Sequence, residues 1–253
     1  NEGAAGDILI QVDNGALIAN GPVISLGGNI LLRAFQDVVI NAPLQSFGHT
    51  TVSAGDDVDQ NANISAGLSV FVSATNNTFD AISGVDMQSG TFIRTTNGNV
   101  RIVADNEGDI LLARIDAGIR DVSLLAERSI LDNNAASSLS VVALAGQNQI
   151  SLVDASGLSI GDEILLQDSA SPSELLLVVA VAGNVVTLSA NLANTFNPGN
   201  GALITAVNIR ANALRMIADA SLSNPSNLNG TIGQPNNVPA DSPAVNRPAI
   251  DTA

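Results

Sequence analysis

The sequence predicts an all-β protein: a right-handed parallel β-helix, or solenoid, with about 20 residues per coil and an inserted small antiparallel β domain. Three observations lead to this fold class. Apolar alternation recurs every 20 residues, Asn, Asp and Gly mark corners between the apolar segments, and one long segment departs from this period. The recurrence is clearest in three triplets that each end in alanine: Ile30, Leu32, Ala34; Thr50, Val52, Ala54; and Val70, Val72, Ala74. One coil cannot bury its inner face alone, so we expect the coils to stack and these alanines to superpose.

Each early coil contains three short apolar segments, which we interpret as three strands separated by corners. The segments of the first two coils lie at 8–10, 17–18 and 23, and at 30–32, 38–40 and 44. The corners contain groups such as Asp13-Asn14-Gly15 and Gly27-Gly28-Asn29. These residue types adopt left-handed backbone conformations at low cost, which favours a tight change of direction.

The period slips at residues 75–90, where polar residues predominate and we expect an enlarged corner or a bulged coil. The pattern then returns. Residues 99–105 are echoed by 121–127, and the same unit recurs much later at 213–219. The coils are therefore predicted to resume after the segment that departs from the period.

That segment reads as a compact antiparallel meander or small barrel. It contains longer apolar runs at 150–153, 161–168, 175–181, 185–188 and 202–204. Gly183-Asn184 between two of these runs is a typical hairpin turn. Because a solenoid corner tolerates insertions, we predict β-helix coils at 1–145, an inserted small β-barrel or meander domain at 146–207, and a continuation of the β-helix at 208–253 that ends in a Pro- and Asn-rich final coil or linker.

Composition restricts the classes of function. The 253 residues include no Cys, which excludes disulfides and thiolate metal sites, and no Trp or Tyr, so the core must be aliphatic. The net charge is −15, every base is Arg, and we expect no nucleic-acid partner because such a surface repels phosphate. The longest apolar run, 175–182, is far below the roughly 18 residues of a membrane span, so none is predicted. The sequence starts at Asn1, with neither an initiating Met nor a signal-peptide pattern, and we expect it to be a segment of a longer polypeptide.

Three repeat units carry a family resemblance: Gly-Asn-Val-x-Ile-x-Ala-Asp at 98–105, Gly-Asp-Ile-Leu-Leu-Ala at 108–113 and Ala-Glu-Arg-Ser-Ile-Leu-Asp-Asn at 126–133. They resemble the filamentous-haemagglutinin-type β-helix repeats of very large bacterial surface and secreted proteins. The Asn-Pro-Asn-type signature of that group's secretion domain is missing here, so the chain resembles an interior rod. The resemblance implies an extracellular or cell-surface location and a non-catalytic structural role in an adhesin-like or filament-forming protein.

Enzymatic readings find little support in the residues. The single histidine, His49, follows Gly48 and precedes Asp56-Asp57, which superficially resembles the motifs of galacturonan-cleaving hydrolases of this fold. Their order is reversed here, and the basic Lys of those enzymes has no counterpart. A lone histidine cannot activate several nucleophiles, so we expect no catalysis, no cofactor, and a corner or strand position for His49.

The metal candidate is calcium at Asp56, Asp57 and Asp59, the densest acidic cluster in the chain. Strand alternation places Asp57 and Asp59 on one face and Asp56 on the other, so we expect a solvent-facing site at most.

Two alternatives to the structural rod stay open: a glycan-binding or polysaccharide-cleaving β-helix protein, and a calcium-ordered surface-layer module. The expected partners of the rod are neighbouring repeats of the same polypeptide or identical copies stacked head to tail. The insertion is a further candidate for binding a host or matrix glycan or protein, because acidic residues occupy its turns. The lack of Trp and Tyr counts against a sugar platform there.

Overall fold

The computed structural model describes residues 6–75, 84–133 and 137–218. Two compact units divide the chain: Asn1–Asn133 with Asn208–Ala253, and Asn134–Val207. Nearly all regular structure in the described residues is β-strand, and the one helical element there is a short 3₁₀ turn, η1 (Pro198–Asn200). The predicted all-β class is therefore confirmed. No helix in the described residues is long and apolar enough to cross a bilayer.

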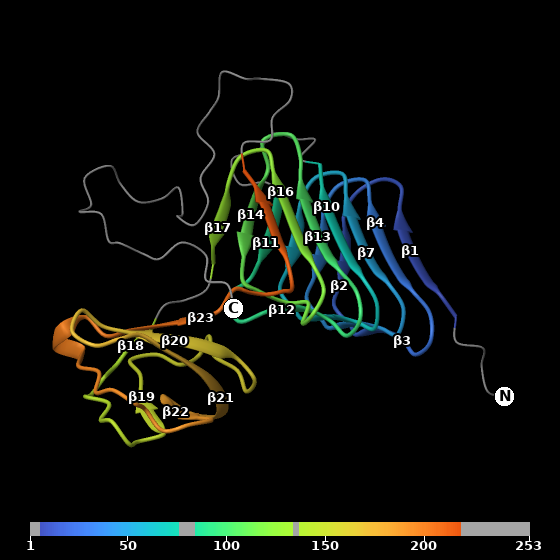
Figure 1. Ribbon diagram of the computed structural model, residues 1–253. Helices are drawn as coiled ribbons and strands as arrows, with labels where there is room; N and C mark the ends of the chain where they lie inside the picture. The colour runs from blue at the N-terminus through green and yellow to red at the C-terminus, as the bar shows by residue number, and fades with distance from the viewer. Residues whose placement is uncertain (1–5, 76–83, 134–136, 219–253) are drawn as a thin grey trace. The chain divides into compact units, whose positions relative to one another are not determined.

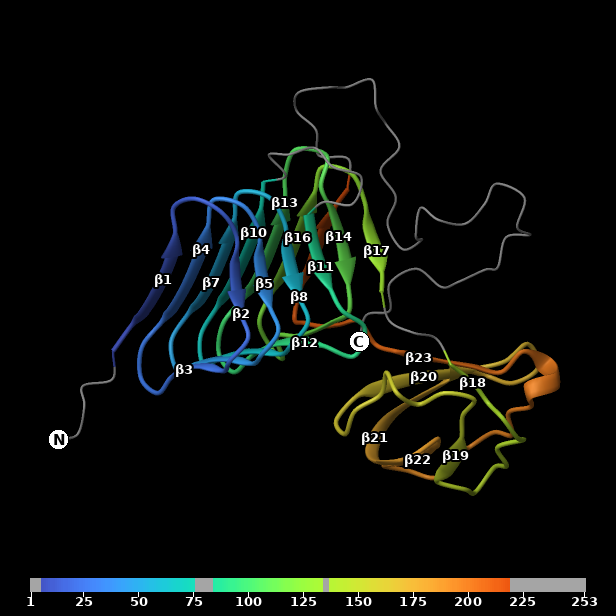
Figure 2. The same cartoon turned by 180° about the vertical axis from the view of Figure 1, so that it is seen from behind.

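The first unit is a parallel β-solenoid with about 22 residues per turn, in which three sheets form three faces around one core (Figures 1 and 2). Sheet A contains β1 (Ile8–Val12), β4 (Ile30–Ala34), β7 (Thr50–Ala54), β10 (Val70–Ala74), β13 (Val100–Ala104), β16 (Val122–Ala126) and β25 (Leu214–Ile217). Sheet B contains β2 (Leu17–Ala19), β5 (Val38–Ile40), β8 (Val58–Gln60), β11 (Gly84–Met87), β14 (Asp109–Leu112) and β17 (Ile130–Asp132). Sheet C contains β3 (Val23–Ser25), β6 (Leu44–Ser46), β9 (Ile64–Ala66), β12 (Phe92–Thr95), β15 (Arg114–Asp116) and β24 (Ile209–Arg210).

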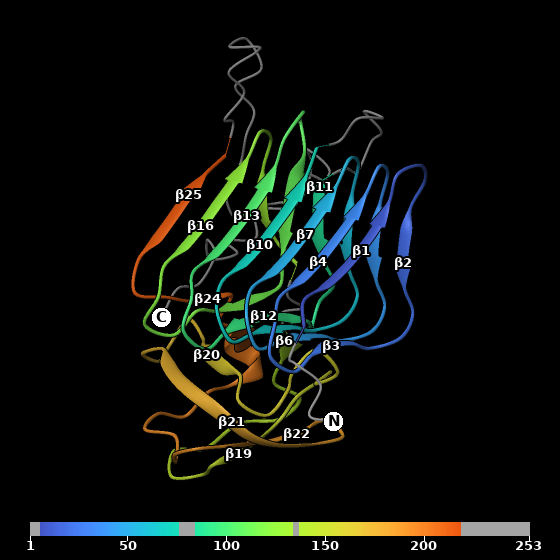
Figure 3. The ribbon, with the colours of Figure 1, turned by 90° about the vertical axis from the view of Figure 1, so that its right-hand side faces the viewer.

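The predicted stacking of alanines is confirmed by the register of sheet A, whose strands lie in order in Figure 3. Ala34 pairs with Ala54, Ala54 with Ala74, Ala74 with Ala104, and Ala104 with Ala126. Side chains at equivalent positions therefore form columns along the solenoid. The inward side chains are almost completely buried, as in β4, where Ile30, Leu32 and Ala34 face the core. Burying one large aliphatic side chain contributes roughly 1.5–3 kcal/mol, so the columns supply most of the driving force for stacking.

Residues 75–90 are more regular than predicted. Strand β11 lies within this segment and pairs in register with β8 on one side and β14 on the other. The connection from Ala74 to Gly84 is longer than the equivalent one from Ala54 to Val58, in line with the expected enlarged corner or bulged coil, but strand β11 was not predicted. Residues 76–83 lie outside the described residues. The inward residues of β11 are only Val85 and Met87, and such a short alternation is hard to detect next to Gly84 and Asp86.

The second unit is a curled antiparallel sheet with the order β18-β23-β20-β21-β22-β19. Its strands are β18 (Ser137–Ser138), β19 (Gln149–Ser151), β20 (Glu163–Gln167), β21 (Glu174–Ala182), β22 (Val185–Leu188) and β23 (Leu203–Ala206). A bridge between Leu139 and Leu152 joins the two ends of the sheet. The apolar interior surrounds Phe196, and the predicted Gly183-Asn184 turn connects β21 to β22. This unit begins before the predicted boundary at 146, because Leu139 and Ala143 belong to its core.

The second unit is inserted between sheet B and sheet C of the solenoid, as the sequence predicted. Strand β17 pairs with β14, and after the insertion β24 pairs with β15. An asparagine lies at each end of this interruption. Asn133 Nδ2 donates to the carbonyl of Met87 at 2.7 Å, and Asn208 Nδ2 donates to the carbonyl of Ala113 at 2.9 Å. These bonds attach both ends of the interrupted coil to preceding coils of the solenoid. Strand β25 then continues sheet A. The final coil or linker predicted beyond residue 218 lies outside the described residues.

Candidate functional site

The corner that precedes sheet A carries a continuous column of polar side chains, which we call the sheet A ladder. Its members occupy the position directly before each strand: Asp7, Asn29, His49, Ser69, Asn99 and Asp121. Each side chain except that of the last member, Asp121, accepts a hydrogen bond from the backbone N–H of the next member. The distances are 2.8, 2.7, 3.3, 3.2 and 3.1 Å in this order. Corner N–H groups that no sheet could satisfy are paired in this way.

His49 belongs to this ladder. Its Nδ1 atom accepts from the N–H of Ser69, while its own N–H donates to Asn29 Oδ1. The side chain is exposed and lies in a corner, in agreement with the expected corner position. An acceptor Nδ1 requires the neutral ring with its proton on Nε2. The contacts of His49 are thus the same kind as those of the Asn and Ser residues above and below it.

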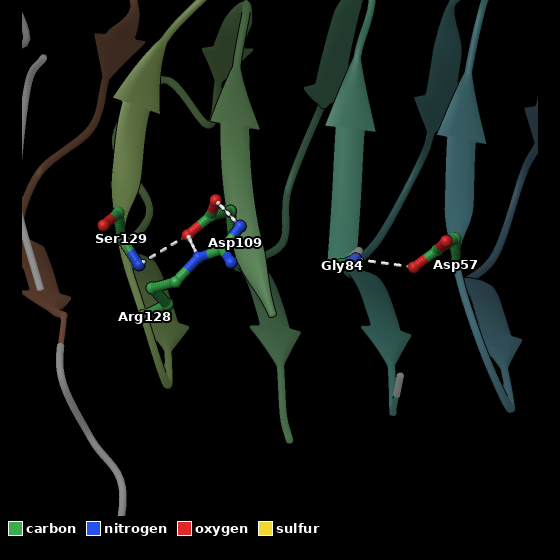
Figure 4. A network of polar contacts seen from close by, with 5 residues as sticks. All are labelled: Asp57, Gly84, Asp109, Arg128 and Ser129. Carbon is green, nitrogen blue, oxygen red and sulfur yellow. Dashed lines mark hydrogen bonds and ion pairs between the residues drawn. The ribbon is translucent and has the colours of Figure 1, made fainter. Parts of the chain in front are cut away.

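A second column, the sheet B ladder, precedes the strands of sheet B (Figure 4). Asp57 N–H donates to Asp37 Oδ1 at 3.3 Å, Gly84 N–H donates to Asp57 Oδ1 at 2.6 Å, and Ser129 N–H donates to Asp109 Oδ1 at 2.8 Å. Asp109 is buried and also forms an ion pair with Arg128, whose Nε lies 2.8 Å from Oδ1. Gly84 interrupts the column because it has no side chain.

The structure brings two of the three predicted calcium ligands together: Asp57 and Asp59 line one small hollow, and Asp56 does not. Asp56 is buried on the inward side, Asp57 bonds to Gly84, and Asp59 lies on the outward face of β8. This follows the expected alternation of Asp57 and Asp59 against Asp56. Within residues 6–75, 84–133 and 137–218, no group of three or more His, Cys, Asp or Glu side chains is arranged to hold a metal ion.

The outward face of sheet B places like charges next to each other. Asp59 and Asp86 are directly paired on β8 and β11. Burial raises the pKa of Asp59, and the charge of Asp37 raises it further. Burial likewise raises the pKa of Asp86, with an added contribution from Asp59. A small hollow of about 40 Å³ lies between these carboxyls, lined by Asp57 and Asp109 as well. Like charges directly opposite one another destabilise a sheet, so this face stores a local electrostatic cost.

A larger groove of about 520 Å³ lies on sheet C. We call it the sheet C groove, and its lining comes from four successive coils: Ser25, Leu26, Gln45, Ser46, Phe47, Ser65, Ala66, Gly67, Leu68, Arg94, Thr96 and Asn97. Three of these residues, Gln45, Ser65 and Arg94, are in register on β6, β9 and β12. The volume lies in the range typical of ligand sites.

Arg94 is held at one side of the sheet C groove. Its Nε donates to Asp116 at 3.2 Å, and its guanidinium lies 4.9 Å from the centre of the Phe92 ring. A guanidinium over an aromatic face is favourable and restricts the side chain. Arg94 thus lines a groove to which no Asp or Glu contributes, and its own charge is paired with Asp116 outside the lining.

The acidic turn residues of the inserted unit accept hydrogen bonds from loops of the same unit. Asp168 accepts from the N–H groups of Ala170 and Ser171, Glu174 accepts from Asn194, and Asp162 accepts from Ser159. The apolar side chains around Phe196 occupy the interior. The predicted binding role of the insertion therefore has no preformed acidic cluster to support it in the described residues.

The ladders could have been predicted from a positional pattern in the sequence, which neither composition nor the motifs considered above reveal. A residue with an acceptor side chain stands directly before each strand of sheet A from β1 to β16. The sheet C groove had no such signal, because it depends on side-chain sizes in coils far apart in sequence. Comparison of the chain with protein-family models, curated proteins and solved structures finds no match.

Proposed function

We propose that this chain is a non-catalytic structural segment of an extracellular, adhesin-like or filament-forming surface protein with filamentous-haemagglutinin-type repeats. The observation that carries the proposal is the sheet A ladder. Its polar corner side chains, His49 included, form hydrogen bonds that join one coil to the next. Each such bond contributes about 0.5–1.5 kcal/mol in net terms. Repeated in every coil, these contacts favour a stiff spacer over a reaction centre.

The stiffness of the spacer follows from its connections. Adjacent coils are joined by three parallel sheets and by corner bonds, so bending would have to break several rows together. Such an element holds attached parts of a polypeptide at a fixed separation. A role in spacing needs neither cofactor nor turnover.

Neighbouring repeats of the same polypeptide or identical copies head to tail are the proposed partners. Strands β1, β2 and β3 stand at the same end of their three sheets, and Leu9 and Ile10 on β1 are exposed. Unpaired strand edges with apolar side chains pair readily with further strands. Sedimentation analysis over a wide concentration range separates the two partners. Mass that grows with concentration supports stacking of copies, whereas a monomer throughout leaves neighbouring repeats as the partner.

Two experiments test the proposal as a whole. Antibodies against this segment should label intact cells that produce the protein, and protease added outside should abolish the label. Labelling that requires permeabilised cells would contradict the surface location. Incubation of the purified chain with acidic polysaccharides, with and without calcium, should leave them uncut. Cleavage would contradict the non-catalytic role.

A further inference from the structure

We propose that the sheet C groove binds a carboxylated sugar ring, with the carboxylate at the guanidinium of Arg94 and the C–H face of the ring on Phe47. This inference does not depend on the spacer role, because the groove is a local feature of four coils. The argument has three parts: the shape of the groove, the position of Arg94, and the charge of the lining.

The shape comes from a difference in side-chain size between neighbouring coils. Backbone bonds from Gly67 to Ser46 and from Thr96 to Ala66 place Phe47, Gly67 and Thr96 in one row. In the row beside it, Ser65 lies between Gln45 and Arg94. The middle coil therefore has the small residues Ser65 and Gly67 at these two positions, where the coils on either side have larger side chains. The result is a trough between two walls.

The floor of the trough cannot be filled easily. A Cβ atom on Gly67 would lie 2.0 Å from the carbonyl oxygen of Phe47, which is backbone and cannot move aside. The coil packing thus excludes every side chain from this position. The hollow is a fixed consequence of how tightly the second and third coils approach each other.

One wall of the trough suits the apolar face of a ring. The Phe47 side chain is 70% exposed, and Leu26 beside it is 84% exposed. Aromatic rings offer a flat apolar surface for the C–H groups of a pyranose, and Phe47 is the one aromatic side chain in the lining. Exposure of two large apolar side chains at one groove is costly in water and favours an occupant.

The opposite wall supplies a positioned cation. Asp116 takes the Nε–H of Arg94 and the Phe92 ring lies under the guanidinium, which orients the terminal amino groups; within the described residues they form no hydrogen bond. Arg presents these donors in a planar fork that matches a carboxylate. The Gln45 and Asn97 amides in the lining are suitable partners for sugar hydroxyls.

Charge selects the same ligand. The whole chain carries a net charge of −15, which repels polyanions, but no Asp or Glu lines this groove. The groove is therefore a place on the described surface where a carboxylate meets a guanidinium without an acidic neighbour in the lining. Arg94 already pairs with Asp116 through Nε, so a ligand carboxylate would add a second anionic partner at the terminal amino groups, which a neutral sugar lacks; the neutral sugar should therefore bind less well.

Two sources can supply a carboxylated ring: a uronate unit within an acidic polysaccharide, or the free sugar acid. Isothermal titration calorimetry of the full chain distinguishes them with three probes: trigalacturonate, galacturonate, and neutral galactotriose. Binding of trigalacturonate well above that of galacturonate indicates a polymer, and equal binding of the two indicates the free acid. Both results support the site. Binding of galactotriose as strong as that of trigalacturonate would overturn it, as would no binding of either acid.

Variants locate the site. Arg94→Gln should weaken trigalacturonate binding about tenfold, because it removes a charge-assisted pair. Phe47→Ala should weaken binding several-fold. Ser65→Leu should fill the trough and abolish binding.

The matched controls are Arg215→Gln on β25 and Phe35→Ala, an exposed ring at another corner. Circular dichroism and the unfolding temperature check that each variant is folded. Equal losses in the control variants, or wild-type binding by Arg94→Gln and Ser65→Leu, would reject the proposal.

Discussion

The solenoid and the inserted unit are both built of β-strands, yet they use their polar side chains in different ways. In the solenoid, corner side chains bond to the equivalent residue of the next coil, as Asn29 does with His49. In the inserted unit, they bond within a loop and to other loops that are not repeats of one another, as Asp168 does with Ala170 and Ser171 and with Asn197. The solenoid therefore gains stability from each added neighbour, whereas the inserted unit depends on its own turns and its closed sheet.

The same difference is visible in the carboxyl groups. Burial and neighbouring acids raise the pKa of Asp59 and Asp86 on the solenoid. Burial also acts to raise the pKa of Asp168 in the inserted unit, but N–H donation from Asn197, Ala170 and Ser171 outweighs it and the pKa is lowered. Stacking identical positions forces like charges together, while an irregular turn can surround one carboxylate with donors.

The largest expected effects come from the two cores. Leu32→Ala in the solenoid and Leu166→Ala in the inserted unit each remove a fully buried side chain. Each should lower the free energy of unfolding by about 2–5 kcal/mol. Because the units have separate cores, each variant should shift a different transition in denaturant titrations followed by hydrogen exchange. Equal loss of protection in both units from either variant would show a single cooperative structure.

Two glycines sharpen the comparison. Gly84 has a φ of +131°, and a Cβ atom there would lie 2.1 Å from the carbonyl oxygen of Asp109 in the next coil. Gly84→Ala should therefore destabilise the solenoid by roughly 2–4 kcal/mol, from backbone strain and overpacking together. Gly183 has a φ of +57° but open space around it, so Gly183→Ala should cost only about 1 kcal/mol. Equilibrium unfolding in urea measures both, and a smaller effect at Gly84 would contradict the close approach of the coils.

The ladder predicts a smaller, residue-specific effect. Asn29→Ala removes the acceptor for His49 N–H and should cost about 1 kcal/mol. Asn29→Asp keeps an acceptor for His49 N–H but replaces the Nδ2 that donates to Asp7 Oδ1 at 2.9 Å with a second carboxylate, so it should keep the His49 bond while losing stability at Asp7. Amide hydrogen exchange at His49 gives a direct readout, since its protection should fall in the alanine variant. Unchanged protection would show that the ladder bond contributes nothing.

The smallest effect concerns pH. A raised pKa in the folded state means that Asp59 and Asp86 favour folding below the ordinary value of 3.8 and lose this contribution as pH rises through the folded pKa. Asp59→Asn should therefore stabilise the solenoid at pH 7 by a few tenths of a kcal/mol, since the group is half exposed. The gain in stability from Asp59→Asn should vanish in acid.

Asp168 has the opposite sign, so Asp168→Asn should destabilise at pH 7, and this loss should fade only as pH falls from 3.8 through the lowered pKa of the folded state. Unfolding curves at several pH values check both signs.

The sequence predicted the solenoid well because its columns repeat at a fixed interval. Ala34, Ala54 and Ala74 superpose as the periodicity indicated, and the insertion lies at a corner. The strand at Gly84–Met87 was missed because only two inward side chains mark it. Detection by periodicity needs several alternations in a row, and this coil offers too few.

The candidate site was less predictable. The cluster of Asp56, Asp57 and Asp59 is dense in sequence, but alternation separates buried Asp56 from Asp57 and Asp59, which line one hollow with Asp86 and Asp109 from other coils. The sheet C groove arises from the reverse effect: Gln45, Ser65 and Arg94 are distant in sequence and adjacent in register. Such a site becomes visible only when the exact interval between coils is known at each position.

The sheet A ladder has a sense of direction. From Asp7 to Asp121, the side chain of the earlier member always accepts and the backbone of the later member always donates. Ala213 is the next position in register, and its side chain has no hydrogen-bond acceptor for a further coil. The array is thus vectorial, and its two termini are chemically unlike. Any assembly that grows by adding coils to this protein would elongate with a defined polarity.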